Sequence, residues 1–268
     1  FWMENVRNVT LESSSAPKPW NESDWLLFNI QQTSYYRVNY DNNLWHLLID
    51  KLNDGSDGFE SIHYRNRAQL IDDSFNLATA EFIEFDILLG IMDYMKYEED
   101  YIPWMAANRA ISFLNPRLTG SKVSKDYQEF LRTNVAALFN RLGIELIPNE
   151  SRLDRYARTI AINVACRNQL PECLEKSNEE LNAYLIDQKR IEPEYLTTIY
   201  CNGLRIGGAF EFFSMQNRML RSSIQSERNN IISAMACTQN IELLNAYLNL
   251  AIIPGITLSF DEKSRILT

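Results

Sequence analysis

The sequence has few of the residues, and none of the short patterns, that mark an active site. Its 268 residues include only two histidines, His46 and His63, which lie 17 positions apart. The pattern His-Glu-x-x-His does not occur, so the sequence contains no zinc-protease helix. The Gly-x-Ser-x-Gly pattern, the P-loop and the glycine-rich dinucleotide-binding pattern are absent as well. We therefore predict no catalytic residue, no metal ligand and no cofactor site in this chain.

Basic segments and membrane-spanning runs are also lacking. The formal net charge is -9 and lysine and arginine do not cluster, which argues against nucleic acid as a partner, because its phosphates require such clusters. The longest uncharged stretch, 243–260, contains Asn245, Asn249, Pro254 and Gly255, so we do not interpret it as a transmembrane segment. The sequence opens with FWMENVRNVT, which has neither an initiator methionine nor the pattern of a signal peptide. We expect it to be part of a longer polypeptide.

One pair of carboxylates, Asp72 and Asp73, is the remaining catalytic alternative. An acid–base pair in a hydrolase requires two carboxylates that converge on one point. Neighbouring residues on a helix point in directions about 100° apart, so these two side chains do not converge. We interpret the pair as part of a solvated helix face.

Hydrophobic periodicity changes near residue 42. Between Trp25 and Asp41, apolar and polar residues alternate, which predicts two short strands joined by a turn at residues 31–34. The alternating apolar residues are Phe28, Ile30, Tyr36, Val38 and Tyr40. Beyond residue 42 the spacing is that of helices almost to the end of the chain.

Three segments show the helical pattern most clearly. Between Val123 and Leu142, apolar residues recur every three or four positions, and Ser121 and Gly143 are the predicted caps of this helix. In residues 66–78, alanine, isoleucine and phenylalanine share one face, and the residues Ser177 to Glu180 have the capping-box pattern. We predict ten or eleven helices with short connections, which favours a stacked helical array over a four-helix bundle.

The four cysteines leave several possibilities open. Cys166 and Cys173 lie too far apart for a Cys-x-x-Cys redox or zinc motif. Of the three possible disulfide connectivities, pairing of sequence neighbours is the simplest, and four buried thiols are the alternative. Asn-x-Ser/Thr triplets, the acceptor pattern for N-glycosylation, begin at Asn8, Asn21 and Asn149, although Asn149 is also a possible helix cap. The triplets and the even number of cysteines favour a secreted protein or an ectodomain.

Five segments in order resemble the C-terminal half of the zinc metallopeptidases of the aminopeptidase N type, especially the insect midgut forms. They are QQTSYYRVNYD, NRAQLIDDSFNLA, YIPWMAA, CRNQLPEC and YCNGLRIGG, and the resemblance extends from about Trp25 to Leu250. It implies a mainly α fold, in which stacked antiparallel helix pairs form an α-α superhelix shaped like a bowl, of the armadillo or HEAT kind. Short β-strands at the end of a β-sandwich would precede this superhelix. The implied domains are residues 1–41, the remnant of a small β-sandwich, and residues 42–268, a helical C-terminal domain that continues beyond Thr268.

The resemblance also implies site residues and partners. Disulfides are implied between Cys166 and Cys173 and between Cys201 and Cys237. The zinc and the catalytic residues of the family lie in a catalytic domain upstream of this chain, which would be its main partner. The domain would cap the active-site cleft, control the access of peptide substrates and take part in a homodimer. The whole protein would be extracellular, either secreted or anchored to the cell surface through another segment. An α-solenoid interaction module with no enzymatic parent is the alternative function.

Overall fold

The computed structural model describes residues 21, 23–145, 147–253 and 258–267. In this described part the regular structure consists of helices, with no β-strand. The 3₁₀ helices are η1 (Ile30–Gln32) and η2 (Asp93–Tyr97). The α-helices are α1 (Asn42–Asn53), α2 (Gly55–Glu60), α3 (Tyr64–Thr79), α4 (Phe85–Met92), α5 (Tyr101–Leu118), α6 (Ser124–Leu142), α7 (Arg152–Arg167), α8 (Pro171–Ile186), α9 (Leu196–Ile206), α10 (Ala209–Arg221), α11 (Gln225–Met235), α12 (Ile241–Ile252) and α13 (Phe260–Leu267).

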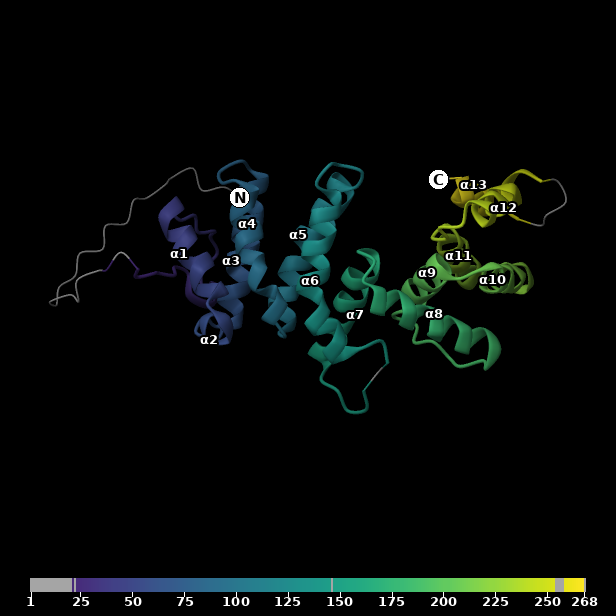
Figure 1. Cartoon of the computed structure of the whole chain (residues 1–268), viewed down its shortest axis with the longest axis horizontal. Coiled ribbons are helices and arrows are strands. Elements are labelled where there is room, and N and C mark those ends of the chain that lie inside the picture. Colours follow the sequence, from purple (N-terminus) through teal and green to yellow (C-terminus); the bar gives the residue numbers. More distant parts are fainter. Residues whose placement is uncertain (1–20, 22, 146, 254–257, 268) are drawn as a thin grey trace.

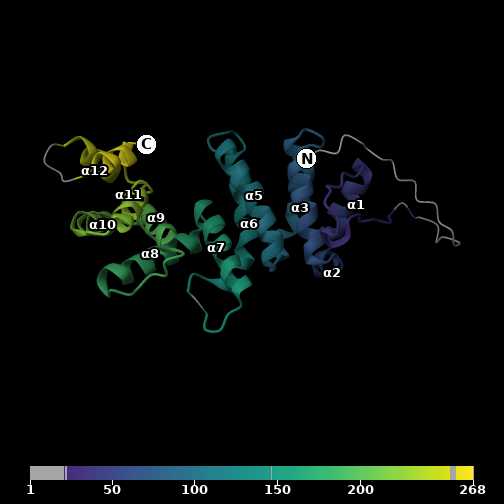
Figure 2. The same cartoon turned by 180° about the vertical axis from the view of Figure 1, so that it is seen from behind.

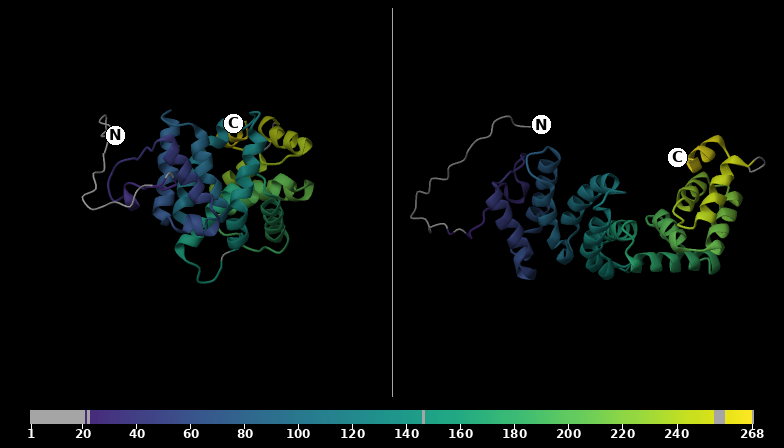
Figure 3. Two further views of the ribbon diagram at one scale, coloured as in Figure 1. Left: turned by 60° about the vertical axis from the view of Figure 1, so that its left-hand side comes forward. Right: turned by 45° about the horizontal axis from the view of Figure 1, so that its top comes forward.

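The helices form a two-layered array in which neighbours in sequence pack as antiparallel pairs. Helices α3, α5, α7, α9 and α11 contact one another in succession and make one layer, while α4, α6, α8 and α10 pack against them. The array bends, so that α1 to α6 form one limb, α7 to α9 a floor, and α10 to α13 a second limb (Figure 1). The view from behind and the tilted view show the same open arch (Figures 2 and 3). The predicted mainly α superhelix is confirmed.

A continuous hydrophobic core holds the array together. The buried cluster extends from Val38 to Ile266 and includes Trp45 and Trp104, each 1 % exposed. Helix α6 shows how the sequence builds this core, because its predicted apolar stripe is buried from Tyr127 to Leu142. Burial of such side chains contributes about 1.5–3 kcal/mol each, so the stripe fixes which face of α6 packs inward.

The predicted strands between Trp25 and Asp41 are wrong for the described residues. The turn is present, and Asn29, Gln31 and Gln32 adopt positive φ angles there. The backbone on either side bonds to side chains instead of to a neighbouring strand. The amide of Val38 donates to Asp73, and that of Phe28 donates to the hydroxyl of Tyr40. The segment therefore lies extended on α3 without forming a β-ladder.

Several predicted helix boundaries also need correction. Ser121 does not cap α6, since its hydroxyl donates to the carbonyl of Leu118 and α6 begins at Ser124. Pro171 starts α8 about two turns before Ser177, so Ser177 lies inside the helix and cannot cap it. Its side chain is fully buried there. The described part has thirteen α-helices, more than the ten or eleven expected, partly because α2 and α4 are short. The division into domains at residue 42 stays a prediction, although α1 does begin at Asn42.

Candidate functional site

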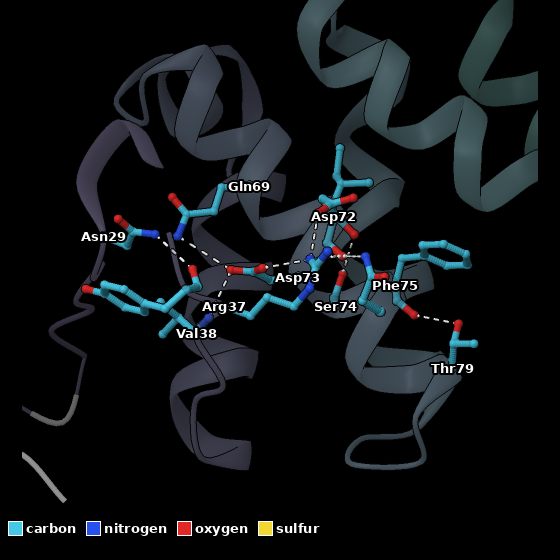
Figure 4. A network of polar contacts seen from close by, with 12 residues as sticks. Asn29, Arg37, Val38, Gln69, Asp72, Asp73, Ser74, Phe75 and Thr79 are labelled. Atoms are coloured by element: carbon cyan, nitrogen blue, oxygen red, sulfur yellow. Dashed lines mark hydrogen bonds and ion pairs between the residues drawn. The ribbon is translucent and has the colours of Figure 1, made fainter. Parts of the chain in front are cut away.

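Asp72 and Asp73 hold the extended segment on α3 and do not form an acid–base pair. The Arg37 guanidinium lies between them, with Nη1 2.6 Å from Asp72 Oδ2 and 3.1 Å from Asp73 Oδ1 (Figure 4). The second oxygen of Asp72 accepts from Arg109 of α5 at 3.2 Å. The second oxygen of Asp73 accepts from the amide of Val38 at 3.1 Å. Every carboxylate oxygen of the pair therefore has a donor from the protein.

The interpretation of both aspartates as a solvated face is wrong for Asp73. Its side chain is 5 % exposed, because the segment before α1 covers this side of α3. Burial raises the pKa of Asp73 to about 6, against the opposing effects of the Val38 amide and the Arg37 charge. Asp73 is thus a buried carboxylate that binds the segment before α1, and its charge depends on pH in the mildly acidic range.

A polar hollow of about 420 Å³ lies between α5, α7 and α9. These helices belong to one layer, and α7 and α9 line the inner side of the bend (Figures 1 and 3). Most of its lining residues have amide, hydroxyl or guanidinium side chains. The lining residues are Asn108, Ile111, Ser112, Asn115, Asn163, Val164, Arg167, Thr197, Thr198, Cys201, Asn202 and Arg205.

The two arginines give the hollow a positive charge. Arg205 donates from Nε to the side chain of Asn202 at 3.2 Å, and burial lowers the pKa of its guanidinium. Arg167 is exposed at the last position of α7. None of the described residues that line the hollow is acidic, whereas Arg67, Arg158 and other arginines in the described part pair with carboxylates. The hollow can therefore offer charged donors and amide groups to an anionic or peptide-like ligand.

The structure joins Cys166 to Cys173 and Cys201 to Cys237, the pairs that the resemblance implies. The first bond connects the end of α7 with the first turn of α8. The second connects α9 with the residues just after α11. Each bond thus links two helices that pack in the array.

The predicted glycosylation sites have different surroundings. Asn8 lies outside the described residues. Asn21 is exposed, and Asn149 is exposed in the turn before α7, where its φ is 62°. Ser151, not Asn149, caps α7, since its hydroxyl accepts from the amide of Asp154 at 3.0 Å. Modification of the three asparagines stays a prediction.

The histidines lie apart from each other and from the hollow. His46 is exposed on α1, and His63 caps α3 by accepting from the amide of Arg65 at 3.3 Å. Across the described ranges, no group of three or more His, Cys, Asp or Glu side chains is close enough to hold a metal ion. Among the helices of these same ranges, none combines the length and the hydropathy that a membrane crossing needs.

The hollow is the functional candidate that the sequence did not reveal. Two of the helices show a row of polar residues in the sequence. On α5, Asn108, Ser112 and Asn115 are spaced by four and three positions. Thr198, Asn202 and Arg205 recur in the same way on α9. Such rows show that one face of a helix is polar, but they do not show that α5 and α9 enclose a common space over α7.

Comparisons with known proteins agree with this architecture. Residues 25–262 match the model of the family described as ERAP1-like C-terminal domain. Aminopeptidase N of Plutella xylostella is 37 % identical over 221 residues, which are 82 % of this chain and 23 % of that protein. Aminopeptidase N of Bos taurus is 33 % identical over 251 residues, 91 % of this chain and 26 % of that protein. Aminopeptidase N of Homo sapiens is 30 % identical over 276 residues, covering all of this chain and 28 % of that protein.

The chain thus spans about a quarter of the length of the curated relatives that it matches. The match of the family model covers almost all of the helical array, from the segment on α3 to α13. This chain therefore belongs to the ERAP1-like C-terminal domain family.

Proposed function

We propose that this chain is the non-catalytic C-terminal domain of a zinc-dependent aminopeptidase. The observation that carries the proposal is the family match over residues 25–262, together with relatives named aminopeptidase N of which the chain spans only a quarter. The rest of such a polypeptide is long enough to contain a separate catalytic domain. That domain is the proposed main partner of the chain.

The residues that the structure describes do not fit a zinc site. His46 and His63 lie apart, and His63 already uses its Nδ1 atom to cap α3. A catalytic zinc requires three protein ligands that meet at one point. We assign the zinc to the catalytic part of the polypeptide, and we assign to this chain a role in substrate access.

The proposed role is to cover the active-site cleft and to contact the peptide as it enters. The bend of the array provides a concave side (Figure 1), and the hollow is formed by α5, α7 and α9. The asparagine side chains of the hollow can bond a peptide backbone, and Arg167 and Arg205 can bond its terminal carboxylate. A peptide whose amino end is at the metal would then be held at its other end as well.

The test uses the full polypeptide that contains this chain, with Arg167→Ala and Arg205→Ala combined. Substrates are peptides of increasing length, each made with a free carboxylate and with a terminal amide, and a short aminoacyl reporter. A hydrogen bond to a charged group contributes about 1.5–3 kcal/mol, so we expect KM to rise about tenfold or more for the longer carboxylate peptides. The amide peptides and the reporter should change little.

The control is Arg190→Ala, which removes an exposed arginine in the loop after α8, outside the hollow. It should leave the KM values of all substrates unchanged. An equal loss for carboxylate and amide peptides at every length would refute carboxylate binding by the hollow. Absence of any aminopeptidase activity in the full polypeptide would instead refute the enzymatic parent and favour an interaction module.

An extracellular location and a dimer complete the proposal. The two disulfides support an oxidising compartment, because such bonds persist in secreted proteins and ectodomains. Treatment of the protein from its natural source with an N-glycosidase should lower its mass if Asn8, Asn21 or Asn149 carries a glycan. Sedimentation of the full polypeptide tests whether this domain takes part in a homodimer.

A further inference from the structure

The two disulfides differ in their exposure to reagents. Cys166 and Cys173 are each 0 % exposed, and their sulfurs face the hydroxyl of Ser177 and the carbonyl of Ile162. Cys201 and Cys237 are both partly exposed. Cys201 lines the hollow, and Cys237 follows the last turn of α11. The residues of the second bond are thus partly open to solvent, whereas those of the first bond are enclosed.

The second disulfide also has a cation beside one of its sulfurs. A terminal nitrogen of Arg205 lies 3.7 Å from Cys201 Sγ, and Arg205 forms no ion pair with a carboxylate of the described residues. Arg167 lies in the same hollow, and none of the described lining residues is acidic. A neighbouring guanidinium stabilises a thiolate, and a stabilised thiolate is a better leaving group in thiol–disulfide exchange.

We propose that the Cys201–Cys237 bond is a thiol–disulfide exchange site, which small dithiols reduce in the folded chain while Cys166–Cys173 stays intact. The distinction rests on the exposure of the second bond and on the position of Arg205, and it is independent of the enzymatic role proposed above. The site takes small thiols as its ligand class, and reduction would free α9 from its covalent link to the end of α11.

The chemistry is a two-step exchange. A thiolate of the dithiol attacks Cys237 Sγ and forms a mixed disulfide, and the electron pair of the broken bond goes to Cys201 Sγ. The leaving thiolate then lies beside Arg205. The second thiol of the reagent loses its proton and attacks the mixed disulfide, so that the reagent leaves as a cyclic disulfide and Cys237 leaves as a thiolate. The reagent loses two electrons, the protein gains them, and an oxidised reagent reverses both steps.

The fold is expected to survive the loss of this link. Helices α9 and α11 pack against each other directly, and Tyr200, Ile231 and Met235 are fully or almost fully buried in the common core. Hydrophobic contacts of this kind do not depend on the disulfide. Reduction should therefore change the mobility around the hollow without unfolding the array.

The test treats the 268-residue chain with increasing dithiothreitol without denaturant, alkylates the free thiols and locates them by peptide mapping. Cys201 and Cys237 should be alkylated first, while the far-ultraviolet circular dichroism stays unchanged. Cys166 and Cys173 should react only after denaturant is added. Simultaneous reduction of both bonds in the folded chain, or earlier reduction of Cys166–Cys173, would overturn the proposal.

A variant tests the contribution of Arg205. Arg205→Met keeps an unbranched side chain and removes the charge, so the exchange rate at Cys201–Cys237 should fall by about 3- to 10-fold. Arg205→Lys should restore most of the rate, and Arg190→Met should leave it unchanged. An unaltered rate in Arg205→Met would exclude the arginine from the exchange. The order of reduction in the unmodified chain tests the site even if a variant folds poorly.

Discussion

Single side chains decide how the segment before α1 is attached to the array. Arg37, Asp72 and Asp73 make the charged contact, and the amide of Val38 donates to the buried oxygen of Asp73. The sequence does not distinguish the two aspartates, which are adjacent residues of α3. Only the docking of a segment more than thirty residues away buries one of them, so their difference could not be predicted from helix spacing.

The raised pKa of Asp73 predicts a pH dependence of stability. Its pKa is about 6 in the folded chain against 3.8 for an ordinary aspartate, so the folded chain binds the proton more tightly. The contribution of protonated Asp73 to the free energy of unfolding is then fully present below about pH 4, and it is lost as the pH rises through about 6. Asp73→Asn imitates the protonated form and lacks this dependence.

We therefore expect the unfolding free energy of the unmodified chain, relative to that of Asp73→Asn, to fall between pH 4 and pH 7. The fall is at most about 3 kcal/mol, the value of a two-unit pKa difference. Urea unfolding of both chains across this range measures it, and other titrating groups cancel in the comparison. A difference that stays constant or increases with pH would show that burial does not raise this pKa.

The sequence predicts a helix well where one of its faces is apolar. It predicts the ends of a helix poorly where those ends depend on contacts with distant residues. The stripe on α6 was sufficient to place that helix, because its residues pack as their spacing requires. The same Ser-x-x-Glu pattern has different outcomes at two places. Ser259 and Glu262 cap α13, whereas Ser177 lies inside α8 because Pro171 has already started the helix. A local pattern cannot show which of several possible starts a helix uses.

Glu262 is expected to hold α13 on α11. Its carboxylate accepts from Arg228 at 2.6 Å and 3.0 Å and from the amide of Ser259 at 2.8 Å. The bond from Arg228 lowers the pKa of Glu262 to about 2, so this attachment is present above about pH 4.5 and is lost as the pH falls through 2. Glu262→Gln should raise the hydrogen-exchange rates of the α13 amides by about tenfold or more at neutral pH.

The matched control for this helix is Asp261→Asn, which changes the adjacent, exposed carboxylate. Its exchange rates in α13 should stay close to those of the unmodified chain. If both variants speed exchange equally, the effect comes from the charge of the helix start and not from the contact with Arg228. Amides of α6 serve as an internal reference in the same experiment.

At the scale of the whole molecule, the sequence predicted the class of fold but not the functional surface. Helical spacing and short connections were enough to predict a stacked array. The bend, and the hollow that α5 and α9 form over α7, arise from contacts among helices far apart in the chain. The absence of catalytic patterns limited what the residues alone could indicate, so the enzymatic assignment depends on the family to which the chain belongs.

The most direct measurement of the central claim is one hydrolysis assay on two proteins, the 268-residue chain and the full polypeptide that contains it. Both receive an aminoacyl reporter with zinc, and then with a chelator. We predict that the full polypeptide releases the reporter and stops when the metal is removed, while the chain alone shows no zinc-dependent turnover. Chelator-sensitive hydrolysis by the chain alone would contradict its role as a non-catalytic domain.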